Sequence, residues 1–240
     1  MHGAGYGDIA GVDEAGRGCW AGPVFAAAVV LPPVCFVDRT LLPEVTDSKL
    51  IAPPKRERLA AEVLAIAKAA AIGWVEAPLI DQINIVGATR LAMVRALTCL
   101  AGGPAEAGPS WGAACLTSGR SAPDYVLIDA LPLPPVGVPQ RAIVRGDRTC
   151  LSIAAASVVA KVARDAEMRR RGERFPAFAL AENKGYGTRR HLEALQRAGL
   201  TPLHRRTFAP MKYLLGVRDC VAGRLPAPPA DPAPAPAADR

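Results

Sequence analysis

The sequence lacks the patterns typical of secreted and membrane-spanning proteins. Its six cysteines include no Cys-x-x-Cys pair and stand mostly among apolar neighbours. No run of about 18 apolar residues occurs, and the N-terminus has no basic segment followed by an apolar one. We therefore expect reduced thiols, a cytoplasmic location and no membrane partner.

Acidic side chains are in the minority. The 240 residues include 22 Asp and Glu against 29 Lys and Arg, which gives a net charge of +7. This balance favours a polyanionic partner, although many basic proteins never bind nucleic acid. Half of the residues are hydrophobic, which is enough to bury one core, so we expect one domain over residues 1–222.

The periodicity of apolar residues predicts a mixed α/β fold. Strands are expected at residues 9–12, 24–31, 71–75, 125–129 and 142–144, and helices at 54–70, 79–100 and 152–165, with further helices and loops to about residue 218. The tight glycine turn between the first two strands predicts that they are antiparallel. The segment 79–100 is either one helix or a broken pair.

Two segments show little apolar periodicity. Residues 101–123 are rich in Gly, Ala, Ser and Pro, which predicts a surface loop or insertion. Residues 223–240 are almost entirely Pro, Ala, Asp and Arg. They offer no apolar surface to bury, so we expect a disordered tail.

Carboxylates stand at the ends of three predicted strands. Asp13 and Glu14 follow the first strand, Asp129 ends the fourth, and Asp147 follows the fifth. If these strands are neighbours, the acids converge and need cations to stay ionised. Carboxylate oxygens without nearby His or Cys favour Mg²⁺ or Mn²⁺, and two such ions about 3.5–4 Å apart serve in-line phosphodiester chemistry. The pattern indicates a nuclease or phosphotransferase, although a single Asp at a strand end is more often a turn former or helix cap.

The residues after the acids allow two interpretations. The glycines of Gly16-Arg17-Gly18 would let backbone N–H groups approach a phosphate or a sugar hydroxyl. The alternative is a plain hairpin turn with a solvated arginine. Ser152 and Ser157 have no His-Asp pair near them in sequence, so a serine nucleophile has little support and packing or capping is the better interpretation.

The sequence from Gly11 to Val24, GVDEAGRGCWAGPV, resembles the signature of the ribonuclease HII family. Further segments resemble that family's motifs in the same order, over roughly residues 8 to 211: Asp47-Ser48-Lys49-Leu50, Asn84-Ile85, Tyr125 to Asp129, Gly146-Asp147, Ser152 to Ser157, Lys184-Gly185-Tyr186-Gly187-Thr188 with His191, and His204-Arg205-Arg206.

The resemblance implies a ribonuclease H-like mixed sheet flanked by helices, with a helical C-terminal part. It implies hydrolysis of RNA in RNA/DNA hybrids and cleavage 5′ of ribonucleotides embedded in duplex DNA, leaving 3′-hydroxyl and 5′-phosphate ends. The implied metal-binding catalytic acids are Asp13, Glu14, Asp129 and Asp147, with two divalent ions, Mg²⁺ or Mn²⁺. The implied substrate-binding residues are Gly16, Arg17, Gly18, Lys49, Lys161, Lys184 and Tyr186.

The resemblance also implies how the sugar is recognised. The Gly-Arg-Gly loop would sense the 2′-hydroxyl, which distinguishes RNA from DNA, and Tyr186 would stack on the following sugar. Without the resemblance, Tyr186 is a loop aromatic covering apolar surface. The side chains of Lys49, Lys161, Lys184 and Arg164 are expected to hold phosphates or the acids, or else to be solvated surface charges.

His191 and His204 are predicted to be hydrogen-bonding groups rather than metal ligands. In many relatives a C-terminal region recruits a replication clamp, and no such motif is visible in this sequence. We expect a monomer, and the sequence gives clamp binding no support.

Overall fold

The computed structural model describes residues 5–38, 40–105, 107–108 and 111–216. The predicted domain end at residue 222 and the predicted tail at 223–240 lie outside these residues.

The described strands form one seven-stranded mixed sheet in the order β4-β5-β3-β2-β1-β6-β7. They are β1 (Ile9–Ala15), β2 (Val24–Val30), β3 (Ala69–Val75), β4 (Ala107–Gly108), β5 (Trp111–Cys115), β6 (Tyr125–Asp129) and β7 (Gln140–Ile143). β1 and β2 are antiparallel, as the glycine turn predicts. β1, β6 and β7 are parallel, so their C-terminal ends lie at the same edge of the sheet.

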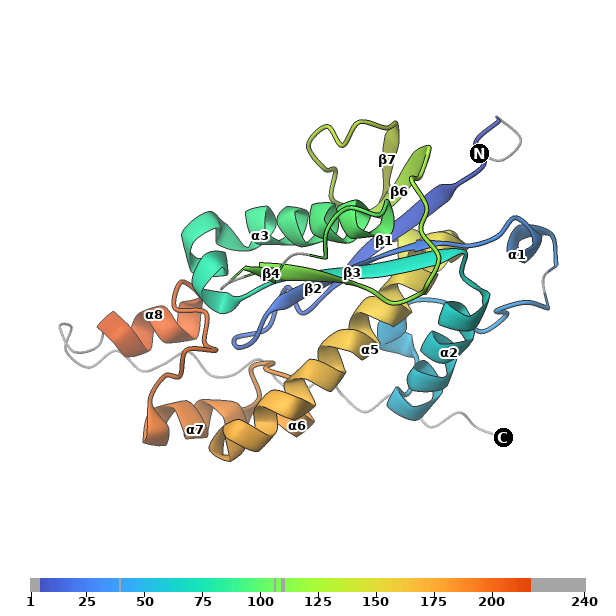
Figure 1. Cartoon of the computed structure of the whole chain (residues 1–240). Coiled ribbons are helices and arrows are strands. Elements are labelled where there is room, and N and C mark those ends of the chain that lie inside the picture. The colour runs from blue at the N-terminus through green and yellow to red at the C-terminus, as the bar shows by residue number, and fades with distance from the viewer. Residues whose placement is uncertain (1–4, 39, 106, 109–110, 217–240) are drawn as a thin grey trace, which may run out of the picture.

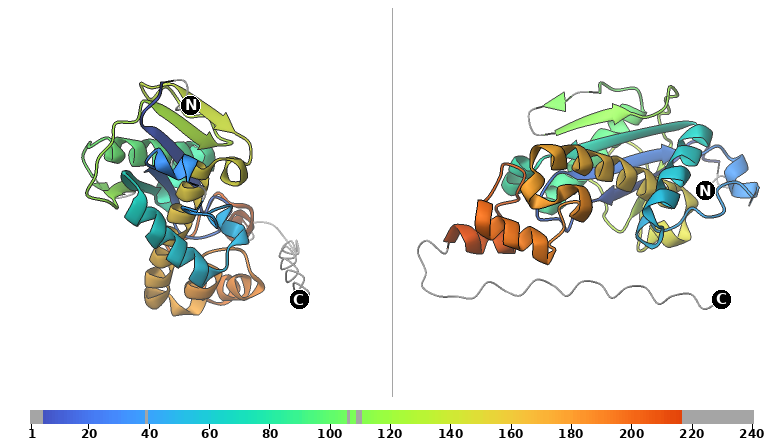
Figure 2. Two further views of the ribbon diagram at one scale, coloured as in Figure 1. Left: turned by 90° about the vertical axis from the view of Figure 1, so that its right-hand side faces the viewer. Right: turned by 90° about the horizontal axis from the view of Figure 1, so that it is seen from below.

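Helices cover both faces of this sheet (Figure 1). Helix α3 (Ala77–Leu100) packs on one face, and α5 (Leu151–Arg174) with α2 (Pro53–Ile66) on the other. The C-terminal helices gather near the end of α5 (Figure 2). The other helical segments are α1 (Val34–Val37), η2 (Ser48–Leu50), α4 (Gly146–Thr149), η3 (Pro176–Phe178), α6 (Leu180–Asn183), α7 (Arg189–Ala198) and α8 (Ala209–Gly216).

Two glycines allow the long helices to lie directly on the strands. A Cβ atom on Gly11 of β1 would stand 2.1 Å from the backbone of Ser152 in α5. On Gly73 of β3 it would stand 2.3 Å from the carbonyl oxygen of Ala92 in α3. The first contact fixes the start of α5 against β1, two residues before Asp13.

Helix α3 is a broken pair, the second of the two predicted alternatives. Asn84 leaves the helical conformation at φ 59°, and its side-chain oxygen accepts hydrogen bonds from the N–H groups of Val86 and Gly87. This capping starts the second helical part. In the described part of the chain, α3 alone is long and apolar enough to cross a membrane. Its buried face belongs to the core against the sheet, so we interpret it as a core helix.

The prediction of a surface loop over residues 101–123 is wrong for β4 and β5, which lie within that segment. β5 pairs with β3 from Ala71↔Cys115 to Val75↔Trp111, and β4 pairs with β5. The residues at the centre of β5 are small because Trp74 lies across the strand: a Cβ atom on Gly112 would stand 2.3 Å from the Trp74 ring. The sequence of β5 therefore lacks the apolar alternation of a typical strand.

The prediction of reduced cysteines is wrong for one pair. Cys99 at the end of α3 and Cys115 at the end of β5 form a disulfide, with Cα atoms 6.1 Å apart. The pairing follows from the unpredicted strand, because β5 places Cys115 beside the C-terminal end of α3. Cys19, Cys35 and Cys150 are free thiols, and Cys220 lies outside the described residues.

Candidate active site

Four predicted acids meet where the parallel strands end. The pairing Val12↔Ile128 sets Asp13 beside Asp129 on adjacent strands. Asp147 lies in α4, just after β7, and the N–H of neighbouring Gly146 donates to the Asp129 carboxylate at 2.7 Å. The parallel register therefore brings together carboxylates that are up to 134 residues apart in the chain, from Asp13 to Asp147.

These carboxylates are short of positive charge. Burial raises the pKa of Asp13 well above its usual range, and the charges of Glu14 and Asp129 raise it further. Burial also raises the pKa of Glu14, although Arg17, whose guanidinium lies 3.7 Å away, opposes the shift. Burial, then Asp47 and Asp129, raise the pKa of Asp147. Added cations would stabilise the ionised carboxylates.

The donor set fits a hard divalent ion. Within the described residues, no three His, Cys, Asp or Glu side chains form a ready-made metal cage. The four acids instead form an open cluster of oxygen donors. Mg²⁺ commonly binds to one or two carboxylates and completes its coordination with water and substrate phosphate. An open carboxylate cluster of this kind suits that mode of binding.

A serine pair supports Asp13. Ser157 of α5 hydrogen-bonds the Asp13 carboxylate, and its hydroxyl oxygen lies 2.9 Å from that of Ser48 in η2. The N–H of Glu14 donates to Asp13 at 2.7 Å. The sequence interpretation gave Ser157 only a packing or capping role, and the signal that could have located it is its place on the small-residue face that meets β1.

Lys49 lies close enough to act on the acids. Asp47 caps η2 by accepting from the N–H of Lys49 at 2.9 Å, and Arg148 of α4 donates to the same carboxylate at 2.9 Å. The charge of Lys49 opposes the upward pKa shifts of Glu14 and Asp147. This predicted substrate-binding residue therefore stands at the site.

Two buried arginines hold the Gly-Arg-Gly loop and the residues that follow it. Arg205 donates to the carbonyls of Gly16, Arg17 and Gly22 at 2.7, 2.8 and 2.9 Å. Arg164 donates to the carbonyls of Pro23, Ala21 and Lys184 at 2.9, 3.2 and 2.9 Å. Arg164 is fully buried, so it is neither a phosphate ligand nor a solvated charge. Sequence reasoning assigned Arg205 no role.

Tyr186 lies beside this loop. The N–H of Trp20 donates to the carbonyl of Gly185 at 2.8 Å, which joins the two motifs. The Tyr186 side chain is 38% exposed and hydrogen-bonds Cys19, and burial raises its pKa to about 12. The ammonium of Lys161 lies 5.5 Å from the centre of its ring.

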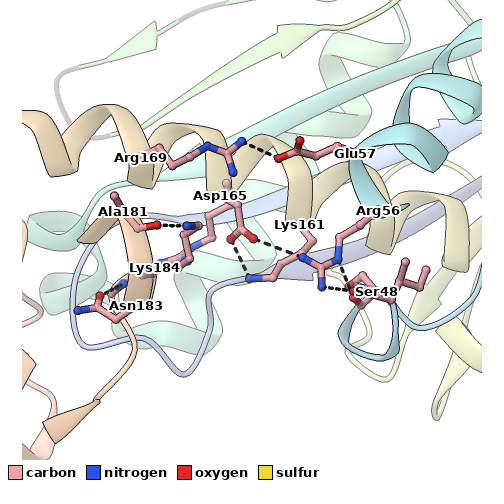
Figure 3. Close-up of polar contacts among 12 residues, drawn as sticks. Ser48, Arg56, Glu57, Lys161, Asp165, Arg169, Ala181, Asn183 and Lys184 are labelled. Carbon is pink, nitrogen blue, oxygen red and sulfur yellow. Dashed lines mark hydrogen bonds and ion pairs between the residues drawn. The ribbon is translucent and has the colours of Figure 1, made fainter. Parts of the chain in front are cut away.

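The remaining predicted residues have other partners. Lys161 is paired with Asp165, and Lys184 donates to the carbonyl of Ala181, both on the side of α5 drawn in Figure 3. His191 and His204 hydrogen-bond each other, which confirms their predicted role as hydrogen-bonding groups.

A mixed sheet flanked by helices, with acids clustered where its parallel strands end, defines a hydrolase of the ribonuclease H-like class. The ribonuclease HII family model matches residues 10–106 and 113–212, and the chain belongs to this family. Enzymes of the family depend on divalent metal ions and hydrolyse the RNA strand of RNA/DNA hybrids, and this chain is such an endoribonuclease.

Relatives match most of the chain. The ribonuclease HII of Chloroflexus aurantiacus is 46% identical over 207 residues, which are 86% of this chain and 89% of the relative. The ribonuclease HII of Roseiflexus castenholzii is 47% identical over 207 residues, 86% and 84% of the two chains.

Solved structures show the same fold at lower identity. The ribonuclease H2 of Pyrococcus horikoshii superposes with a TM-score of 0.67 at 24% identity, over 86% of this chain and 96% of that chain. The RNase HII of Archaeoglobus fulgidus, solved in a complex with PCNA, superposes with a TM-score of 0.63 at 24% identity, over 84% of this chain and 95% of that chain. These matches confirm the predicted fold class.

Proposed function

We propose that this enzyme also cleaves 5′ of single ribonucleotides embedded in duplex DNA and leaves 3′-hydroxyl and 5′-phosphate ends. The observation that carries the proposal is the rigid junction between the Gly-Arg-Gly loop and Tyr186. Arg164 packs against Gly16 and donates to the carbonyls of Ala21, just after the loop, and Lys184, while a backbone hydrogen bond joins Trp20 to Gly185. The proposed sugar-sensing loop, which begins two residues after Glu14, is thereby tied to the segment that carries Tyr186.

The acids act as holders of cations in this proposal. Two Mg²⁺ or Mn²⁺ ions bound by Asp13, Glu14, Asp129 and Asp147 would supply the charge that favours water attack and departure of the 3′ oxygen. A neighbour with the same fold, Bst-RNase HIII at 19% identity and a TM-score of 0.60, was solved in complex with Mn²⁺. The N–H groups of Glu14 and Gly146 orient the carboxylates of Asp13 and Asp129.

The loop would recognise the ribose. Arg205 binds the carbonyls of Gly16 and Arg17, so these groups point into the protein. Gly18 is open, with nothing within 4 Å of the position of a Cβ atom. A 2′-hydroxyl can approach the backbone there, and the exposed part of the Tyr186 ring can stack on the next sugar, where deoxyribose fits and a further hydroxyl is crowded.

A second candidate is a DNA-cleaving nuclease on the same sheet. The test offers three duplexes, with one ribonucleotide, with a full RNA strand and with DNA only, each with and without Mg²⁺ or Mn²⁺. We expect cleavage of the first two only, and only with metal. Failure to cut the single-ribonucleotide duplex with either ion would overturn the proposal.

Removing one metal-binding acid gives a further check. Asp13→Asn and Asp129→Asn should each abolish turnover while the fold and most hybrid binding persist, because each loses a ligand charge and little volume. Near wild-type, Mg²⁺-dependent turnover in either variant would contradict the assignment of the acids.

The proposal includes a cytoplasmic monomer, which rests on the sequence alone. The Archaeoglobus relative was solved bound to PCNA, so clamp binding is a property of a protein with this fold. For this chain, clamp binding has no support from a sequence motif, and that interpretation stays a prediction.

A further inference from the structure

Asp165 of α5 stands between two cations from different parts of the chain. Lys161, one turn earlier on the same helix, donates to one carboxylate oxygen at 2.7 Å. Arg56 of α2 lies 3.5 Å from the other oxygen. All three side chains are largely buried. Figure 3 shows these residues on the face of α5 that meets α2.

On one side of Asp165, Lys161 contacts Tyr186, the proposed sugar-stacking residue. With its ammonium fixed by Asp165, Lys161 lies over the Tyr186 ring at 5.5 Å from the ring centre, within cation–π range. Lysine has four flexible side-chain bonds, so it would not keep one orientation there without a partner. Asp165 supplies that partner from the rigid helix.

On the other side of Asp165, Arg56 is linked to the catalytic acids through Ser48 and Ser157. Arg56 donates to the carbonyls of Ser48 and Ile51 at 2.7 and 2.6 Å, which ties η2 to α2. The hydroxyl of Ser48 is hydrogen-bonded to Ser157, which hydrogen-bonds Asp13. An unbroken chain of polar contacts thus joins Tyr186 to Asp13, with Asp165 at its centre.

We propose that Asp165 is a positioning residue that acts through Lys161: it holds Tyr186 in the orientation that selects a deoxyribose after the ribonucleotide. The inference rests on the proposed cleavage at single ribonucleotides. It assigns Asp165 an effect on substrate preference, which a purely structural ion pair would not have.

The test compares kcat/KM on a single-ribonucleotide duplex with kcat/KM on a full RNA/DNA hybrid. Asp165→Asn keeps the shape and loses the charge. We expect kcat/KM on the single-ribonucleotide duplex to fall about tenfold, the scale of one charge-assisted hydrogen bond. The hybrid should lose less, because every sugar next to Tyr186 there is a ribose, so the ratio of the two values falls. Asp165→Glu, which keeps the charge, should restore part of the ratio.

Glu57→Gln is the matched control. Glu57 of α2 pairs with Arg169 of α5 at 2.9 Å, so it joins the same two helices through an exposed contact that involves neither Lys161 nor Ser48. This variant should keep the wild-type ratio. If Glu57→Gln lowers the ratio of the two kcat/KM values as much as Asp165→Asn does, the effect comes from the contact between α2 and α5 in general and not from Asp165.

A double-mutant cycle tests whether Asp165 acts through Lys161. In a Lys161→Met background, Asp165→Asn should change the ratio no further. Additive effects, or an unchanged ratio in Asp165→Asn, would overturn the proposal. A wild-type enzyme that does not cut the single-ribonucleotide duplex would instead count against the proposed function.

A substrate-free measurement keeps the two failures separate. Lys161 is held in a buried pair, so an amine-acylating reagent should modify it slowly, as followed by peptide mass spectrometry. The Asp165→Asn variant should react several-fold faster at Lys161, and Glu57→Gln at the wild-type rate. Equal rates in all three proteins would show that Asp165 does not hold the lysine.

Discussion

The imidazoles of His191 and His204 face each other with their Nε2 atoms 3.0 Å apart, in the buried C-terminal part. The N–H of Thr201 donates to Nδ1 of His204, so that nitrogen is an acceptor and the proton of the neutral ring is on Nε2. His204 therefore donates to His191, and His191 donates from Nδ1 to the carbonyl of Tyr186 at 2.9 Å. The pair supports the backbone of the proposed sugar sensor only while both rings are neutral.

Acidification should therefore destabilise the protein through this pair. Burial, and then the neighbouring His191, lower the pKa of His204 from 6.5 to about 4. The unfolded chain takes up this proton first as the pH falls, so the contribution is complete above pH 6.5 and is lost between 6.5 and about 4. Its full size is about 3 kcal/mol, at about 1.4 kcal/mol per pH unit.

Urea unfolding at pH 7 and pH 5 measures this effect. His204→Gln keeps a donor and an acceptor but cannot take up a proton, so its stability should change less between the two pH values. The carboxylates titrate alike in both proteins and cancel in the comparison. An equal pH dependence in both would show that the pair does not contribute.

Gly16→Ala should strain the Gly-Arg-Gly loop. Gly16 has φ +87°, and a Cβ atom there would stand 1.8 Å from Nε of Arg164, whose guanidinium is held by three carbonyls and cannot move aside. We expect a loss of about 2–4 kcal/mol in the free energy of unfolding. At Gly18 nothing lies within 4 Å, so Gly18→Ala is the matched control. Thermal unfolding should separate the two variants, and equal melting temperatures would contradict the packing described for Arg164.

Local sequence motifs predicted the acids of this site better than the buried arginines and the strand that support it. The acids of β1 and the small residues of α5 are contiguous in sequence, and each stands in an apolar pattern that indicates its element. The contact of Arg205 with Gly16 spans 189 residues, and that of Arg56 with Asp165 spans 109. No local pattern distinguishes such an arginine from a solvated one, because its partners are main-chain carbonyls or a carboxylate that only the fold brings near. β5 was missed for a related reason, since the Trp74 ring on the neighbouring strand provides its packing.

The Cys99–Cys115 disulfide should stabilise the attachment of β5. It closes a separation of 16 residues, and a loop of that length corresponds to about 3 kcal/mol in the chain-entropy account. Reductant should lower the urea midpoint of the wild type, and Cys115→Ser should show the lower midpoint without reductant. Cys150→Ser, at a free cysteine, should behave as wild type. Alkylation followed by mass measurement gives the number of free thiols, and blocking of both sulfurs in the native protein would rule out the bond.

Asp13→Asn should stabilise the metal-free enzyme while it abolishes turnover. The buried Asp13 carboxylate lies beside Glu14 and Asp129, and both raise its pKa. An amide of the same shape keeps an acceptor for the N–H of Glu14 and removes one of three mutually repelling charges. With a chelator present, we expect the melting temperature to rise by several degrees, on the order of 1–2 kcal/mol for a domain of this size.

Adding Mg²⁺ should raise the melting temperature of the wild type above that of Asp13→Asn. An ion that binds only the folded state stabilises it by mass action, and the wild type keeps the ligand that the variant lacks. Asp38→Asn is the control, because hydrogen bonds from Thr40 lower the pKa of this exposed aspartate, so its neutralisation should not stabilise the protein. A melting temperature of Asp13→Asn below that of the wild type in chelator would contradict this account. It would show that the acids do not repel one another and need no cation to stay together.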